Sequence, residues 1–92
     1  MQEYSYYNFD GDVIDTIYYS IEGNIFTVKD KNGRKASRKI KEESGWCYKF
    51  MKTIVKAEDG PEGLKRFIER TSRPGSVMNS AFFGVLERVL NT

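Results

Sequence analysis

The sequence predicts an α+β fold in which an antiparallel β-meander of three to four strands is followed by two to three helices. Over residues 1–40, apolar and polar residues alternate and turn dipeptides recur at short intervals. After residue 41 the apolar spacing changes to the 3.6-residue period of a helix. We expect the 92 residues to form one domain, with the sheet in 1–41 and the helices of 42–92 packed on one face of it.

Four strands are predicted, over 4–9, 13–22, 25–31 and 34–40, separated by the dipeptides Asp10-Gly11, Gly23-Asn24 and Asn32-Gly33. Dipeptides of this kind favour two-residue hairpin loops. A two-residue loop at Gly23-Asn24 makes Ile21 face Phe26 and Tyr19 face Val28 on the core side. In the first hairpin, either register puts Asp15 on the side that should be buried, a conflict that a β-bulge would resolve.

The same loop rule at Asn32-Gly33 pairs Lys29 with Ala36, and Asp30 with Lys35 on the inner side. This register would place four cations on the outer face of the sheet together with Tyr18, namely Lys29, Lys31, Arg34 and Arg38.

Helical spacing of apolar residues predicts an amphipathic helix over 46–55, for which a strand is the rival interpretation. A second helix is predicted from Asp59-Gly60-Pro61, with Leu64, Phe67 and Ile68 buried. A last helix, capped by Ser76, is expected to bury an apolar stripe of Val77, Met78, Phe82, Val85, Leu86 and Val89. Gly84 inside that helix suggests close packing against a neighbour.

Charge is sorted along the chain. Residues 1–28 carry −5 with no Lys or Arg, residues 29–56 carry +7, and residues 57–92 are neutral, which gives a net charge of +2. Seven cations and one acid lie between Lys29 and Lys41. Such a cluster favours an anionic partner, and the alternative is an exposed edge hairpin that lysines keep soluble.

The candidate nucleic-acid contacts are therefore the cations of this hairpin, with Tyr18 as a stacking surface for an unpaired base: Lys29, Lys31, Arg34, Arg38, Tyr18 and the turn residue Asn32. Lys35 and Lys39 are expected to contact a protein partner. Phe83 lies off the inward stripe of the last helix, so it is expected either to contact a partner or to pack against the neighbouring helix.

Missing residue types argue against an enzyme. The chain has no histidine and only one cysteine, Cys47, which removes mixed zinc clusters and the commonest base of a nucleophile. Counted from Asp10, position twelve of a calcium loop would be Ile21 instead of glutamate, and none of the eight glycines precedes a lysine. We expect no metal, no cofactor and no small-molecule substrate, with a carboxylate-pair nuclease as an outside alternative.

No run of eighteen apolar residues occurs, so no membrane association is expected and the predicted location is the cytoplasm of a host cell.

The chain resembles the phage-encoded anti-CRISPR proteins that inhibit type I-F surveillance complexes. The resemblance rests on size and element order: residues 4–12 (YSYYNFDGD) open a meander, residues 31–35 (KNGRK) form a hairpin, and residues 72–76 (SRPGS) precede a terminal helix. It implies a non-enzymatic inhibitor, monomeric when free. This inhibitor would bind the guide RNA and backbone subunits of the complex and block hybridisation of target DNA. The alternative is a small nucleic-acid-binding regulatory module of a phage or plasmid.

Overall fold

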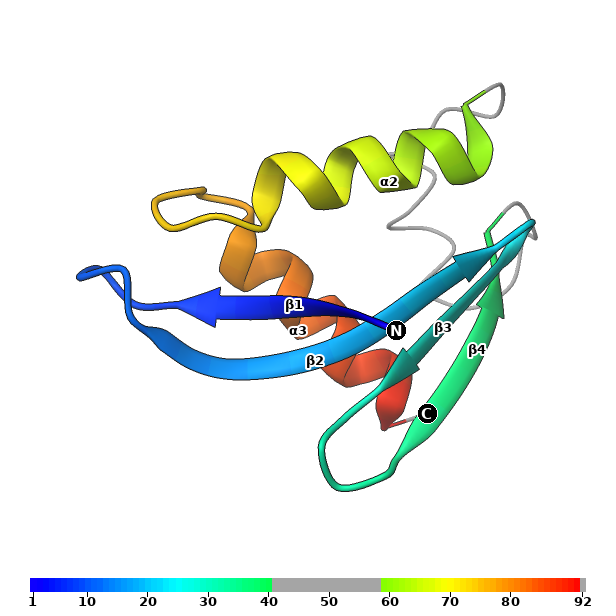
Figure 1. Ribbon diagram of the computed structural model, residues 1–92, viewed down its shortest axis with the longest axis horizontal. Coiled ribbons are helices and arrows are strands. Elements are labelled where there is room, and N and C mark those ends of the chain that lie inside the picture. The colour runs from blue at the N-terminus through cyan, green and yellow to red at the C-terminus, as the bar shows by residue number, and fades with distance from the viewer. Residues whose placement is uncertain (41–58, 92) are drawn as a thin grey trace.

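The computed structural model describes residues 1–40 and 59–91. Strands β1 (Gln2–Tyr7), β2 (Val13–Glu22), β3 (Ile25–Lys29) and β4 (Lys35–Lys39) precede helices α2 (Gly60–Thr71) and α3 (Asn79–Leu90). The strands form one antiparallel sheet in the order β1-β2-β3-β4, so each strand pairs with the next along the chain (Figure 1). The α+β meander is confirmed. The helix predicted over 46–55, and its strand rival, lie outside the described residues.

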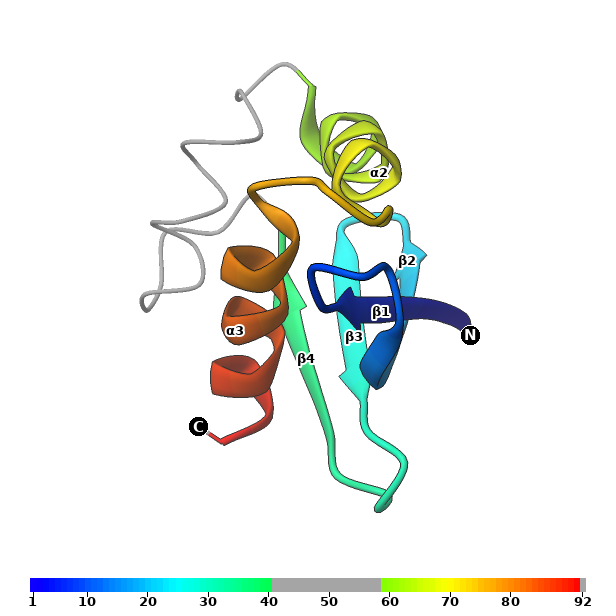
Figure 2. The same ribbon diagram turned by 90° about the vertical axis from the view of Figure 1, so that its left-hand side faces the viewer.

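One face of the sheet carries the core, because the helices pack on that side only in the part of the chain that is described (Figure 2). The buried ring of Phe82 on α3 joins the layers: its centroid lies 5.3 Å from that of Tyr4 on β1 and 5.1 Å from that of Phe67 on α2. Both contacts are edge-to-face, a favoured arrangement of aromatic pairs. The opposite face of the sheet, called the outer face below, is left to solvent by the described helices.

Helix α2 begins as predicted, with Pro61 in its first turn and its predicted stripe of Leu64, Phe67 and Ile68 buried. Helix α3 begins later than predicted. Its N-cap position is Met78 and no side chain caps it, so the predicted cap at Ser76 is wrong. Val77 and Met78 are exposed rather than buried, because they precede the first turn of the helix and do not share its apolar stripe. Within residues 1–40 and 59–91, no atom lies within 4 Å of a Cβ added at Gly84, so the expected close packing is not found among these residues.

The predicted register of β2 and β3 is confirmed, with Ile21 opposite Phe26 and Tyr19 opposite Val28. The predicted register of β3 and β4 is wrong by one residue, since Lys29 faces Lys35 and Val28 faces Ala36. The expected pairing of Asp30 with Lys35 is lost with it.

A three-residue loop causes the difference. The Oδ1 atom of Asp30 accepts the backbone N–H groups of Asn32 and Arg34, at 3.0 and 2.9 Å. Gly33 donates its N–H to the carbonyl oxygen of Asp30 and takes a φ of +92°. A type I turn followed by a left-handed glycine is the usual three-residue hairpin connection. Because strand side chains alternate, this one-residue slip exchanges the two faces of β4.

The first hairpin repeats this loop. Asn8 Oδ1 accepts the N–H groups of Asp10 and Asp12, and Gly11 has a φ of +86°. The predicted bulge is present, because Tyr6 faces Asp15 while Tyr7 faces Val13. The bulge does not turn Asp15 outward. Its carboxylate stays on the inner side at the end of the sheet, part-exposed and 3.9 Å from the Nζ atom of Lys31.

A buried polar cluster ties β1 to the helices. The side-chain oxygen of Asn79 accepts the N–H of Tyr7 at 3.1 Å, and its amide nitrogen donates to the carbonyl oxygens of Ser5 and Thr71 at 2.9 and 3.0 Å. The hydroxyl of Tyr4 donates to Thr71 Oγ1 at 2.7 Å. Asn79 therefore occupies the free edge of β1 as a neighbouring strand would.

Candidate nucleic-acid interface on the outer face of the sheet

The observed register defines which residues lie on the outer face. The set is polar almost throughout: Glu3 and Ser5 on β1, Thr16, Tyr18, Ser20 and Glu22 on β2, Ile25, Thr27 and Lys29 on β3, and Lys35, Ser37 and Lys39 on β4. Its two acids lie on β1 and β2 and its three lysines on β3 and β4. The outer face is therefore graded from negative to positive across the sheet.

Lys29 and Lys35 lie directly opposite each other, next to the hydrogen-bonded end of the hairpin. Like charges placed directly opposite destabilise a strand pair. Both side chains are exposed, and neither forms an ion pair within residues 1–40 and 59–91. On its other side Lys29 faces Tyr18, which in turn faces Glu3 on β1. One row across the sheet therefore presents a carboxylate at the β1 edge, an aromatic ring and two ammonium groups.

Small hydroxyl side chains form the next row. Ser20 faces Thr27, and Thr27 faces Ser37 with their oxygens 2.9 Å apart. A similar contact joins β1 and β2, where the hydroxyl oxygens of Ser5 and Thr16 lie 3.4 Å apart. These side chains are shorter than those of Tyr18 and the lysines on the same face. Each hydroxyl can donate or accept a hydrogen bond.

The four cations predicted to lie on the outer face of the sheet do not lie together there. Arg34 donates from Nε to Asp30 Oδ2 at 2.6 Å and from Nη1 to the side-chain oxygen of Asn91. Arg38 faces Phe26, on the helix side of the sheet. The expected place of both arginines on the outer face is therefore wrong, because the slip in register turned them inward.

Other predicted residues are also redistributed. Lys31 and Asn32 are exposed in the loop itself, where Lys31 lies near Asp15. Lys35 and Lys39, predicted to contact a protein, join Lys29 and Tyr18 on the outer face. Sequence reasoning missed this grouping. The signal that could have found it is an Asn or Asp three residues before the loop glycine.

The predicted partner contact at Phe83 is wrong. Its side chain is only 3% exposed, and its ring stacks on that of Tyr6 with the centroids 5.4 Å apart. The packing alternative is correct in kind, and the ring partner found within residues 1–40 and 59–91 is Tyr6 on strand β1.

Asp30 holds the basic hairpin in shape. Burial alone raises the pKa of its carboxyl, but hydrogen bonds from the side chain and backbone N–H of Arg34, together with the guanidinium charge, outweigh burial and lower that pKa below its ordinary value. The carboxylate therefore stays ionised and fixes both the loop and Arg34.

Within the described ranges, no group of three or more cysteine or carboxylate side chains is placed to hold a metal ion. Neither α2 nor α3 is long and apolar enough to cross a membrane. Comparison with protein-family models, with curated proteins and with solved structures finds no match to this chain.

Proposed function

We propose that this protein is a non-enzymatic binding protein that holds single-stranded RNA against the outer face of its sheet. In this proposal Lys29 and Lys35 bind backbone phosphates, Lys39 extends the basic side, and Tyr18 stacks on an unpaired base. The observation that carries it is the row in which two opposed lysines, neither ion-paired among the described residues, lie beside an aromatic ring.

Electrostatics supports a phosphate ligand. The repulsion between Lys29 and Lys35 is relieved when an anion lies between them. A nucleic-acid strand also releases condensed counterions when lysines neutralise its phosphates. Aromatic rings on a polar surface then add stacking energy that tolerates any base.

The hydroxyl row supports RNA over DNA. Ser20, Thr27 and Ser37 lie one row from the lysines, and their oxygens can exchange hydrogen bonds with a ribose 2′-hydroxyl. That hydroxyl is the group by which a protein distinguishes RNA from DNA. A single strand fits better than a duplex, because only unpaired bases expose a face to Tyr18.

A salt titration with a labelled single-stranded RNA oligonucleotide tests the phosphate contacts. Fluorescence anisotropy gives the slope of log K against log salt concentration, which should become shallower by about 1.4 in a Lys29→Gln/Lys35→Gln variant. The matched control is Lys65→Gln/Arg66→Gln, which removes the same charge from cations paired with acids on and beside α2. An equal change of slope in both variants, or no RNA binding by the unmodified chain, would contradict the proposal.

Stacking is tested separately. Tyr18→Leu keeps an apolar side chain in the strand but removes the ring, and should weaken RNA binding about 5- to 150-fold without changing the salt slope. A Tyr7→Leu variant is the control, because Tyr7 lies at the bulged end of β1 away from the lysines. Unchanged affinity in Tyr18→Leu would remove the ring from the mechanism.

The inhibitor role implied by the resemblance is the narrowest form of the proposal. The RNA would then be the guide of a type I-F surveillance complex. Binding of target DNA by the purified complex should fall in proportion to added protein, and Lys29→Gln/Lys35→Gln should abolish that effect. Tight binding to bare RNA without any effect on the complex would instead favour a free regulatory module.

A further inference from the structure

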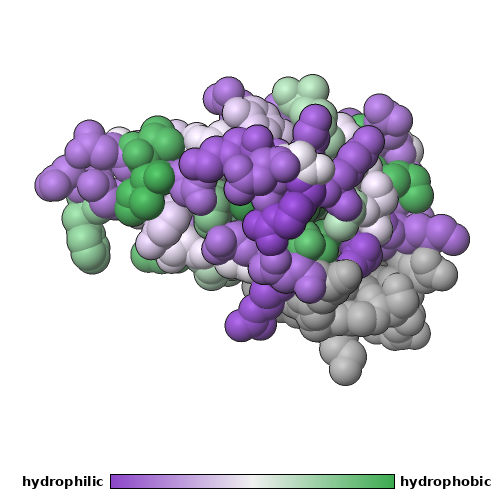
Figure 3. All heavy atoms as spheres, turned by 90° about the horizontal axis from the view of Figure 1, so that it is seen from below, coloured by the Kyte–Doolittle hydropathy of each residue, from purple (hydrophilic) through white to green (hydrophobic). Residues whose placement is uncertain are grey.

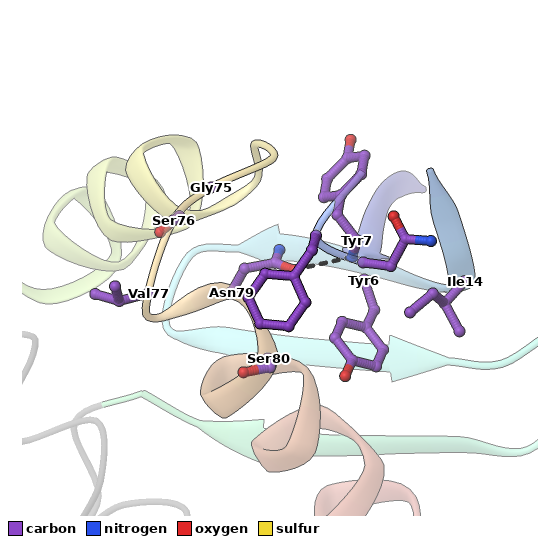
Figure 4. A pocket seen from close by; sticks show the side chains of 10 residues that line it. Tyr6, Tyr7, Ile14, Gly75, Ser76, Val77, Asn79 and Ser80 are labelled. Carbon is purple, nitrogen blue, oxygen red and sulfur yellow. Dashed lines mark hydrogen bonds between the residues drawn. The ribbon is translucent and has the colours of Figure 1, made fainter. Parts of the chain in front are cut away.

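A cleft lies away from the lysines of the outer face, between the β1–β2 loop and the connection from α2 to α3. Its volume is about 540 Å³, and the apolar side chains that line it are Tyr6, Tyr7, Phe9, Ile14 and Val77 (Figure 4). The two walls meet where Pro74 approaches Gly11. Clefts that bind ligands commonly have volumes of about this size.

The rim of the cleft is unusually apolar for a solvated surface. Phe9 is fully exposed, Val77 is 89% exposed and Ile14 is 54% exposed. Seen from below, hydrophobic residues reach the surface at the left end of the molecule, where the β1–β2 loop lies, while hydrophilic residues dominate the middle (Figure 3). Single exposed apolar residues are ordinary, but a group of them around a cleft marks an interaction site.

The walls are held in place without a ligand. Asn79 accepts the N–H of Tyr7 at 3.1 Å, and Tyr6 is stacked on Phe83. Asn8 fixes the loop by accepting two backbone N–H groups from within it. Because the backbone of the loop is already fixed, a partner that binds here does not meet the cost of ordering that loop.

Charge identifies the kind of occupant. Asp10 and Asp12 are exposed in the loop that forms one wall, and neither has an ion-pair partner within 1–40 and 59–91. Residues 1–28 contain no Lys or Arg, and the facing connection supplies one cation, Arg73. The acids disfavour nucleic acid, since they would repel phosphates, and favour a positively charged partner.

We propose that this cleft binds a segment of a partner protein in which a large apolar side chain lies next to Lys or Arg. The apolar side chain enters between Phe9, Ile14 and Val77, and the cation pairs with Asp10 or Asp12. This surface is separate from the outer face that binds RNA in the proposed function, so one chain can hold a protein and an RNA together.

Selection from a displayed library of random peptides tests the proposal. The peptides recovered should combine a large apolar residue with a neighbouring Lys or Arg, and a synthetic peptide of that consensus is the probe for affinity. Ile14→Asp and, independently, Val77→Asp should each weaken its binding about tenfold or more, because both side chains are exposed and their loss removes apolar contact without disturbing the core.

The acids are tested by charge removal. Asp10→Asn/Asp12→Asn removes the one ion pair that the cation forms, so it should weaken binding of the consensus peptide about 1.4- to 5-fold at low salt. The matched control is Glu3→Gln/Glu22→Gln, which removes the same charge from the outer face and should leave the peptide affinity unchanged.

Three outcomes would overturn the proposal: no peptide enriched, a consensus without a cation, or self-association that Ile14→Asp abolishes, which would make a second copy of this chain the occupant. Binding of single-stranded RNA is measured on the same Ile14→Asp and Val77→Asp variants. It should be retained, so failure here is distinguishable from failure of the proposed function.

Discussion

Replacing Asn79 should destabilise the fold far more than replacing any exposed asparagine. Its side chain is 3% exposed and makes three hydrogen bonds, to the backbone of Tyr7, Ser5 and Thr71. Asn79→Ala leaves all three backbone groups without this partner. It also opens the free edge of β1, which Asn79 covers.

The expected cost follows from the burial of each group. The Thr71 carbonyl is buried, so leaving it unpaired costs about 1–3 kcal/mol, whereas the part-buried groups of Tyr7 and Ser5 lose a net hydrogen bond of about 0.5–1.5 kcal/mol each. Together the free energy of unfolding should fall by about 2–6 kcal/mol. A domain of this length is stable by about 5–14 kcal/mol, so the melting temperature should drop by at least about 8 °C.

Urea denaturation followed by circular dichroism measures the free energy of unfolding, and hydrogen exchange reports whether the Tyr7 amide loses protection. Asn32→Ala is the control. That side chain is exposed in the β3–β4 loop, and its loss should change stability by no more than about 0.5 kcal/mol. Asn79→Asp keeps the acceptor for Tyr7 but turns a carboxylate oxygen toward two carbonyl oxygens, so it should be at least as destabilising at neutral pH. A cost below about 1 kcal/mol for Asn79→Ala, with the Tyr7 amide still protected, would refute the role given to this side chain.

Three further predictions concern charge and helix propensity. Because hydrogen bonds from Arg34 lower the pKa of Asp30 below 3.8 despite its burial, the stability that this carboxylate contributes is lost as the pH falls from 3.8 through the folded-state pKa. Asp30→Asn keeps a side-chain oxygen that can accept the loop N–H groups, as Asn8 does in the other loop. This variant should show a smaller fall in unfolding free energy below pH 3.8, and an unchanged fall would contradict the role of the carboxylate. Burial raises the pKa of Tyr4 above 10.0, so stability should fall as the pH rises above 10.0, and less steeply in Tyr4→Phe, where Tyr19 still titrates. An identical alkaline limb in Tyr4→Phe would argue against the buried hydroxyl. Gly84→Ala should raise the free energy of unfolding by about 0.5–1 kcal/mol, because the added methyl group meets open space inside a helix, and a loss of stability in the same urea experiment would show hidden crowding.

The strands were predictable because their periodicity and their glycines are local signals. At Gly23-Asn24 the glycine takes a φ of +58° at the first position of a two-residue loop, and the register on both sides follows. At Asn32-Gly33 only the glycine is left-handed. The buried carboxylate of Asp30, which a dipeptide rule ignores, selects a loop one residue longer.

The one-residue error in the predicted register of β3 and β4 explains most of the differences between the predicted and the observed candidate site. The sequence predicted a basic hairpin beside Tyr18. The observed register places Lys35 and Lys39 on the outer face with Tyr18, and it places Arg34 and Arg38 on the helix side. The cleft was missed for another reason. Val77 fits the apolar stripe of α3 by spacing, and only the later start of that helix leaves it at the surface.

In the two hairpin loops, the residues that the backbone geometry requires can be separated from those that it does not. Both require an Asn or Asp whose side chain accepts two backbone N–H groups, and a left-handed glycine three residues later. The three remaining positions of each loop are free of that requirement. In one loop they hold Phe9, Asp10 and Asp12, and in the other Lys31, Asn32 and Arg34. One backbone design accommodates both sets, but the second loop pairs its cations within the fold, since Arg34 binds Asp30 and Lys31 lies 3.9 Å from Asp15. The first set has no such explanation, because Asp10 and Asp12 form no ion pair within residues 1–40 and 59–91. The acids of the first loop therefore favour a cationic protein segment there, whereas the polyanion of the proposed function is favoured by Lys29 and Lys35, which flank the second loop.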